Sequence, residues 1–150
     1  MRIGIAIVAL AMTMCSSLAN ADFRIYKDYD VSDAVWSVTT IKVKPNMIDA
    51  YLEGVKKTWA SGMEVSKSLG QIEDYMVYVS DLPESGSMNV LLVVKFKNDT
   101  MVGPNKARYD AFVAKFGEAQ QKATTEQAQR DYPAMRDITG EYQMRAVTFK

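Results

Sequence analysis

The sequence contains no histidine, and only one cysteine, Cys15, among its 150 residues. A Ser-His-Asp or Cys-His catalytic group cannot form without an imidazole. A disulfide within the chain needs a second cysteine. Cys15 also lies in an N-terminal segment that we expect to be removed, so imidazole and thiolate sites for zinc, copper, iron or haem are excluded. We therefore expect no cofactor and no metal site, although a hard cation held by oxygen ligands stays open.

The sequence has no excess of positive or negative charge. The chain carries 18 basic and 18 acidic side chains. A near-neutral balance gives no electrostatic reason to expect nucleic acid or an anionic membrane surface as a partner. The remaining chemistry is that of carboxylate, lysine, arginine and tyrosine groups.

Residues 1–21 are typical of a cleavable signal peptide. Met1-Arg2 is a short positive region, Ile3 to Met14 is apolar, and Ala19-Asn20-Ala21 is a small-x-small cleavage site before Asp22. The apolar core is too short for a spanning helix, which needs ~20 residues. We expect cleavage, export to the periplasm or the medium, and no membrane association afterwards. A lipidated Cys15 is the alternative, but Met14 replaces the small residue usual before such a cysteine.

The remaining chain alternates between strand and helix patterns. Residues 22–34 are expected to form an N-terminal arm packed by its aromatic side chains. Strands are predicted over 35–44, 71–80, 88–97 and 141–149, the last after a turn at Gly140. Helices are predicted over 45–69, capped by Gly70, and from Gly103-Pro104 to Phe116, followed by a polar helical run over 118–130 that Pro133 ends or kinks.

The order strand, helix, strand, strand, helix, strand predicts one α+β domain over 35–150 with a ferredoxin-like, four-stranded antiparallel sheet. Two helical segments cover only one face of such a sheet. The other face is also apolar, because Leu91 and Val93 alternate with Leu92, and Trp36 and Val38 oppose Ile41 and Val43. We therefore expect a homodimer with sheets packed face to face. The alternative is that the arm or the 118–130 helix covers this face.

Three segments resemble the dimeric α/β-barrel superfamily: Ile-Lys-Val-Lys-Pro-Asn-Met at 41–47, Leu-Leu-Val-Val-Lys-Phe-Lys-Asn at 91–98, and Gly-Glu-Tyr-Gln-Met-Arg at 140–145. The resemblance covers about residues 35–149 and implies the ferredoxin-like fold, a dimer, and a ligand between sheet and helices or inside the barrel. That superfamily includes cofactor-free monooxygenases, haem-degrading enzymes, chlorite dismutases, stress proteins and uncharacterised members. Its haem branches generally rely on a histidine, which this sequence lacks.

Charged side chains within apolar strands are the candidate site residues, since burying a charge without a partner is costly. Lys95 and Arg145, if they share a face, are predicted to bind a carboxylate or phenolate. Asp74 lies in the neighbouring strand. The aromatic candidates for stacking on the ligand are Trp36, Tyr75 and Tyr78. The plainer interpretation is that these charges sit at strand ends and pair across strands.

The predicted function is binding of a small apolar or aromatic ligand by an exported dimer. One alternative is a cofactor-independent monooxygenase or isomerase, which needs a pocket that holds Trp36 or a tyrosine beside a base such as Asp74. The other is a structural or interaction protein without a ligand.

Overall fold

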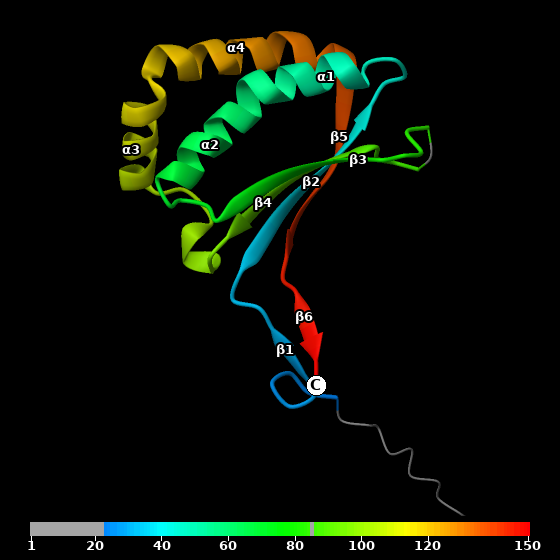
Figure 1. The fold of residues 1–150 in the computed structure, drawn as a ribbon, viewed down its shortest axis with the longest axis vertical. Helices are drawn as coiled ribbons and strands as arrows, with labels where there is room; N and C mark the ends of the chain where they lie inside the picture. Colours follow the sequence, from blue (N-terminus) through cyan, green and yellow to red (C-terminus); the bar gives the residue numbers. More distant parts are fainter. Residues whose placement is uncertain (1–22, 85) are drawn as a thin grey trace, which may run out of the picture.

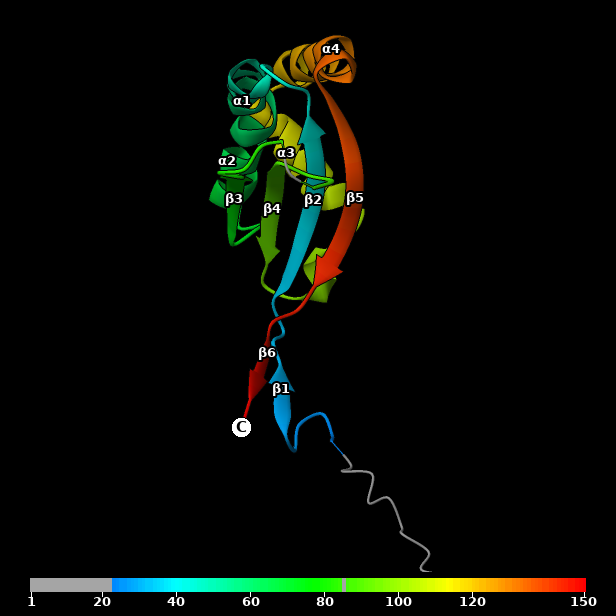
Figure 2. The same ribbon diagram turned by 90° about the vertical axis from the view of Figure 1, so that its right-hand side faces the viewer.

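The computed structural model describes residues 23–84 and 86–150. The predicted signal peptide at 1–21, with Cys15, lies outside these residues. Four strands form one antiparallel sheet in the order β3-β4-β2-β5, with β2 at Val35–Val43, β3 at Asp74–Val79, β4 at Val90–Phe96 and β5 at Arg136–Met144. Figure 2 shows these strands side by side.

Helices cover one face of this sheet (Figure 1). The first helical stretch runs without a break through α1 (Ile48–Val55), the π-helical η1 (Lys56–Ala60) and α2 (Ser61–Ser68). The second region consists of α3 (Lys106–Phe116) and α4 (Glu118–Met135), after the short 3₁₀ helix η2 (Asp99–Met101). The βαββαβ order and the strand order confirm the predicted fold class. The chain has a ferredoxin-like fold. Among the described residues, no helix has the length and apolar character needed to cross a membrane.

Helix ends follow local backbone chemistry. The amide of Gly70, whose φ is +67°, donates to the Lys67 carbonyl, and the Gln71 amide donates to the Ser66 carbonyl. These two bonds form a Schellman motif, so the predicted cap at Gly70 is confirmed. Gly117, with φ +92°, forms the corner between α3 and α4. A side chain is strained at such a φ, so glycine suits the corner.

The core lies between the helices and one face of the sheet. Its buried members come from both layers: Ile41, Val43, Tyr51, Val55, Val90, Leu92 and Tyr132. Buried Asn89 replaces a backbone pairing beside β2, because its side chain accepts from the Val43 amide at 2.7 Å and donates to the Val43 carbonyl at 2.8 Å.

The C-terminal strand differs from the prediction. β5 runs through Gly140, where the register against β2 shifts, and the helix before it continues two residues past Pro133. A glycine inside a strand often marks such a bulge. Val147–Phe149 forms a separate strand, β6, which pairs with β1 (Tyr29–Val31). Figures 1 and 2 show this two-stranded terminal ribbon extending away from the end of the sheet.

Candidate functional site

The sheet face opposite the helices, here called the open face, is apolar. The strand register places its side chains in two rows across the four strands. The first row is Asp74, Lys95, Trp36 and Met144, and the second is Met76, Val93, Val38 and Tyr142. Tyr78 and Leu91 follow on the same face. The predicted alternation in the strands at 35–44 and 88–97 is therefore confirmed.

No described element covers the open face. Helix α4 packs on the other side of the sheet with the remaining helices, and the terminal ribbon projects past the sheet's end (Figure 1). Tyr142 and Met144 are consequently 54% and 55% exposed. The arm packs on itself instead, with the rings of Phe23 and Tyr29 stacked at 5.3 Å. Neither of the two segments proposed as alternative covers lies on this face.

Three of the predicted site residues are neighbours in the first row of the open face. The Lys95 ammonium lies 5.5 Å from the centre of the Trp36 ring and 2.9 Å from a Glu73 carboxylate oxygen. Asp74 accepts a hydrogen bond from Lys67 at 2.8 Å, which with the Tyr75 amide lowers the pKa of the carboxyl group. A carboxylate so held is a weak base, so this arrangement does not favour the oxygenase hypothesis.

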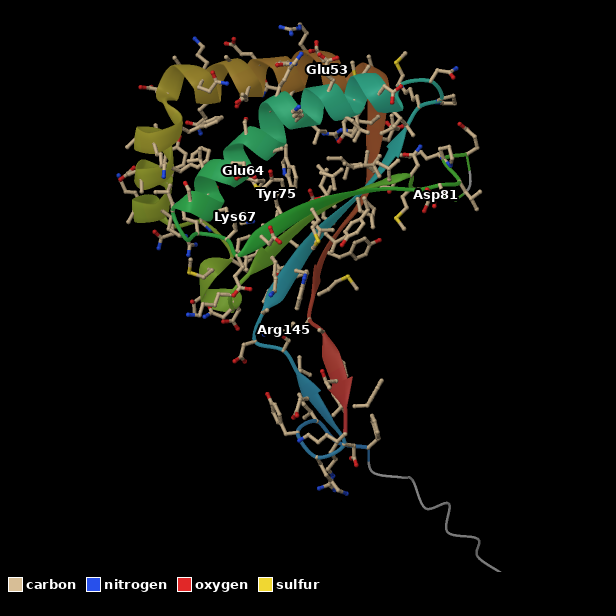
Figure 3. The ribbon with its side chains drawn as sticks, in the orientation of Figure 1. Glu53, Glu64, Lys67, Tyr75, Asp81 and Arg145 are labelled. Carbon is tan, nitrogen blue, oxygen red and sulfur yellow. The ribbon has the colours of Figure 1, made fainter. Side chains whose placement is uncertain are left out.

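The two predicted tyrosines lie on opposite faces of β3. Tyr78 is on the open face, about half exposed, and its hydroxyl lies 3.0 Å from the Met76 sulfur. Tyr75 lies between β3 and α2 (Figure 3). Its hydroxyl donates to Glu64 at 2.6 Å, and this bond raises the pKa of Tyr75 to about 12. Tyr75 also packs edge-on against the Trp59 ring, so it belongs to the helix layer.

Arg145 does not join Lys95. It follows β5, where the sheet gives way to the terminal ribbon (Figure 3). Its guanidinium donates to the carbonyls of Ser32 and Asp33 at 3.0 Å and to Asp99 at 3.0 Å. These contacts tie the arm to η2 and leave Arg145 in a structural position. The predicted Lys95–Arg145 pair is therefore not brought together.

A cavity of about 420 Å³ lies between α2, α3 and the end of β4, and is called here the α2–α3 cavity. Its apolar walls come from five segments and include Met63, Ile72, Val94, Phe96, Met101 and Phe112. Ligand cavities in proteins are typically ~300–1,000 Å³ and mainly apolar. Sequence analysis predicted the helices that carry Met63 and Phe112 but did not identify this cavity.

Two of the polar side chains at the α2–α3 cavity, Arg108 and Gln71, are hydrogen-bonded to backbone. Arg108 donates to the carbonyls of Thr100 at 3.1 Å and Gly103 at 2.8 Å. The Gln71 amide donates to the Arg108 carbonyl at 2.8 Å. These bonds brace the mouth of the cavity and leave no unpaired charge inside, which suits a neutral apolar occupant. In the described part of the chain, no cluster of three acidic, cysteine or histidine side chains could hold a metal ion.

No family model and no curated protein matches the sequence. Solved structures do resemble the fold. A Shewanella oneidensis protein has a TM-score of 0.49 and 15% identity, covering 80% of this chain and 98% of its own. A NIPSNAP family protein of unknown function from Agrobacterium tumefaciens has a TM-score of 0.47 and 17% identity, covering 82% and 95%.

A third similar structure, from Bacteroides fragilis, is described as a dimeric protein of unknown function with a ferredoxin-like fold. Its TM-score is 0.40 at 10% identity, and the match covers 81% of this chain and 100% of that one. At these identities the similarity is one of fold alone.

Proposed function

We propose that the protein is an exported homodimer that binds a small apolar or aromatic molecule in the α2–α3 cavity. The observation that carries the ligand proposal is the cavity itself. Its volume is about 420 Å³, its walls are mainly apolar, and Arg108 and Gln71 at its mouth are hydrogen-bonded to backbone. A neutral ligand would bury apolar surface there and displace no ion pair. Export rests on the signal peptide predicted at residues 1–21.

The dimer proposal rests on the open face. Four strands ~4.8 Å apart and about six residues long span roughly 400 Å² in projection. Monomeric soluble proteins rarely expose contiguous apolar patches larger than a few hundred Å². A second copy can cover the patch symmetrically, because a two-fold axis pairs the same surface on both chains.

Charges at the margins of the open face fit a second copy as well. One margin carries Lys95 beside Asp74, and the other carries Lys42 opposite Asp137 in the β2–β5 register. Both signs occur at each margin, so either relative orientation of the two sheets can bring opposite charges together. A strongly basic or acidic partner would instead meet like charges at both margins.

The ligand proposal is tested with N-phenyl-1-naphthylamine, a neutral aromatic probe whose fluorescence rises in apolar sites. We expect saturable binding to the purified protein, at least tenfold weaker in Met101→Trp, where the larger ring fills the cavity mouth. Met47→Trp is the matched control, because Met47 is exposed and outside the cavity. Equal binding by Met101→Trp and the wild type, or no binding by the wild type, would overturn the proposal.

A further inference from the structure

Arg136 is a cation in the helix-sheet layer without an anion. It is the first residue of β5 and pairs in register with buried Val43, which directs it to the helix side. Its guanidinium carbon lies 5.3 Å from the centre of the Tyr132 ring and 6.0 Å from that of Tyr51. Within the described chain the guanidinium forms no ion pair and no hydrogen bond of normal geometry, and its Nε is buried without a partner. An unpaired buried donor of this kind costs stability.

The two rings that flank Arg136 are held rigidly. Tyr51 and Tyr132 pack edge to face, with ring centres 5.2 Å apart. The Tyr132 hydroxyl is hydrogen-bonded to Thr58 in η1, and Thr58 in turn donates to the Gly54 carbonyl at 3.0 Å. Gly54 has no side chain, and a Cβ there would lie 3.0 Å from the Tyr132 ring. The absence of a side chain at Gly54 therefore leaves space for the Tyr132 ring, which contacts the Arg136 guanidinium.

Tyr51 is fully buried, and its hydroxyl forms no hydrogen bond of normal geometry; the polar group it interacts with is the Arg136 guanidinium. Burial raises the pKa of Tyr51 to about 12, an effect that the nearby Arg136 charge opposes. The hydroxyl is therefore neutral at physiological pH and does not neutralise the arginine. Arg136 therefore faces a neutral phenol and two aromatic rings, whereas the donors of Arg108 end on backbone carbonyls.

A cavity of about 520 Å³ opens beside the cluster. Arg136 lines it together with the Tyr132 ring, Ala128, Pro133 and Ile138. The nearby acid Asp131 is already paired, at 2.8 Å, with Arg130. Exposed Asp137 also lines the cavity, so a bound anion must face the Arg136 end. The cavity thus combines, at one end, a guanidinium that forms no ion pair within the described chain with carbon-lined walls.

We propose that this cavity, between α4 and the start of β5, binds the carboxylate of a small organic monoacid through Arg136. The planar guanidinium presents paired N–H donors that match the two oxygens of a carboxylate. The Tyr51 and Tyr132 rings position the guanidinium by cation–π contact. A single cation matches one negative charge, and Ala128, Pro133 and Ile138 supply apolar contact for a carbon skeleton. This site is separate from the α2–α3 cavity and takes a charged ligand where that cavity takes a neutral one.

Benzoate is the probe, measured by isothermal titration calorimetry on the full exported protein at low salt. Benzyl alcohol and inorganic phosphate are titrated in parallel. We expect saturable benzoate binding that is at least tenfold tighter than either comparison, since hydrogen bonds to charged groups carry most of the affinity. Phosphate binding equal to that of benzoate would overturn the carboxylate assignment, and equal binding of the alcohol would overturn the role of the charge.

Variants locate the site. Arg136→Met should weaken benzoate binding by roughly tenfold or more, whereas Arg130→Met, which removes an exposed cation from the same region, should change it less than twofold. If Arg136→Met does not fold, two other variants decide: Arg136→Lys, which keeps the charge but loses the paired donors, and Ile138→Trp, which fills the cavity from an exposed position. Both should weaken binding. Unchanged binding in folded Arg136 variants overturns the proposal.

The proposals for the two sites can be refuted separately. Met101→Trp, in the α2–α3 cavity, should leave benzoate binding unchanged while it weakens N-phenyl-1-naphthylamine. Benzoate lost in Met101→Trp but kept in Ile138→Trp would place the anion in the wrong cavity and overturn this inference alone. Absence of naphthylamine binding with Arg136-dependent benzoate binding would overturn only the proposed apolar function.

Discussion

A carboxylate introduced at the centre of the open face tests whether this face is a dimer interface or a solvent-exposed surface. Val38 lies on β2 between Val93 and Tyr142 in the register, and it is half-buried in the single chain. Water reaches this face in a monomer, so Val38→Asp should lower the free energy of unfolding by only about 1–2 kcal/mol. In a face-to-face dimer, two carboxylates would be buried without partners.

Desolvation of a buried ion costs several kcal/mol, so two such ions oppose dimerisation by at least ~4 kcal/mol. Every 1.4 kcal/mol changes a dissociation constant tenfold. We therefore expect the dimer dissociation constant of Val38→Asp to rise about a thousandfold or more.

Sedimentation velocity over a concentration series measures this shift. Ala123→Glu is the control, because Ala123 is exposed on α4 and the variant adds the same charge away from the sheet. A folded Val38→Asp that remains as dimeric as the wild type would refute the argument that the open face is the interface. Dissociation of the control to the same extent would refute it too, since net charge alone would then explain the effect.

Three further predictions concern stability. Asn89→Ala removes the side-chain hydrogen bonds to the Val43 amide and to the carbonyls of Val43 and Pro83. Urea unfolding should show that the free energy of unfolding falls by about 2–4 kcal/mol. A fall below about 1 kcal/mol would contradict a stabilising role for these bonds. Burial raises the pKa of Tyr51 to about 12, so the folded protein keeps a proton that the unfolded chain releases near pH 10. The free energy of unfolding should therefore fall between these two pH values, and less steeply in Tyr51→Phe. Equal slopes in the two proteins would refute the raised pKa of Tyr51. Lys67 lowers the pKa of Asp74 from 3.8, so the ion pair stabilises the fold above that pH and its contribution is lost on acidification. The melting temperature of Lys67→Met should therefore decrease less below pH 4 than that of the wild type. An equal decrease in both proteins would count against a stabilising pair.

The central strands were predictable because their side chains obey a strict period of two. Val90, Leu92 and Val94 alternate with Leu91 and Val93, and the register places the two sets on opposite faces. The same rule already separated Tyr75 from Tyr78, since a spacing of three puts two residues on opposite faces of a strand. The prediction that both rings stack on one ligand was therefore wrong for one of them, since they lie on opposite faces.

The C-terminal region was harder because local signals conflict with tertiary pairing. Gly140 is typical of a turn, yet β5 passes through it with a shift in register against β2. The Tyr142 ring lies over this glycine, since a Cβ at Gly140 would fall 2.6 Å from the Tyr142 hydroxyl oxygen. Helix α4 also continues past Pro133. Sequence analysis therefore expected Arg136 in a loop and did not identify it as a site residue, whereas in the structure it begins β5.

The candidate charges were separated by long-range contacts that composition does not encode. Lys95 and Arg145 are each an isolated cation within or beside an apolar strand. Only the tertiary structure shows that Arg145 binds the carbonyls of Ser32 and Asp33, more than 100 positions earlier in the chain. Lys95, Trp36 and Asp74 became neighbours through strand register instead.

Native mass spectrometry of the protein purified from an exporting host tests the central claim most directly. The predicted result is a dimer of chains that begin near Asp22, which retains one small organic molecule per chain and loses it on mild activation. A monomer at micromolar concentration would contradict the proposal that the open face joins two copies of this chain.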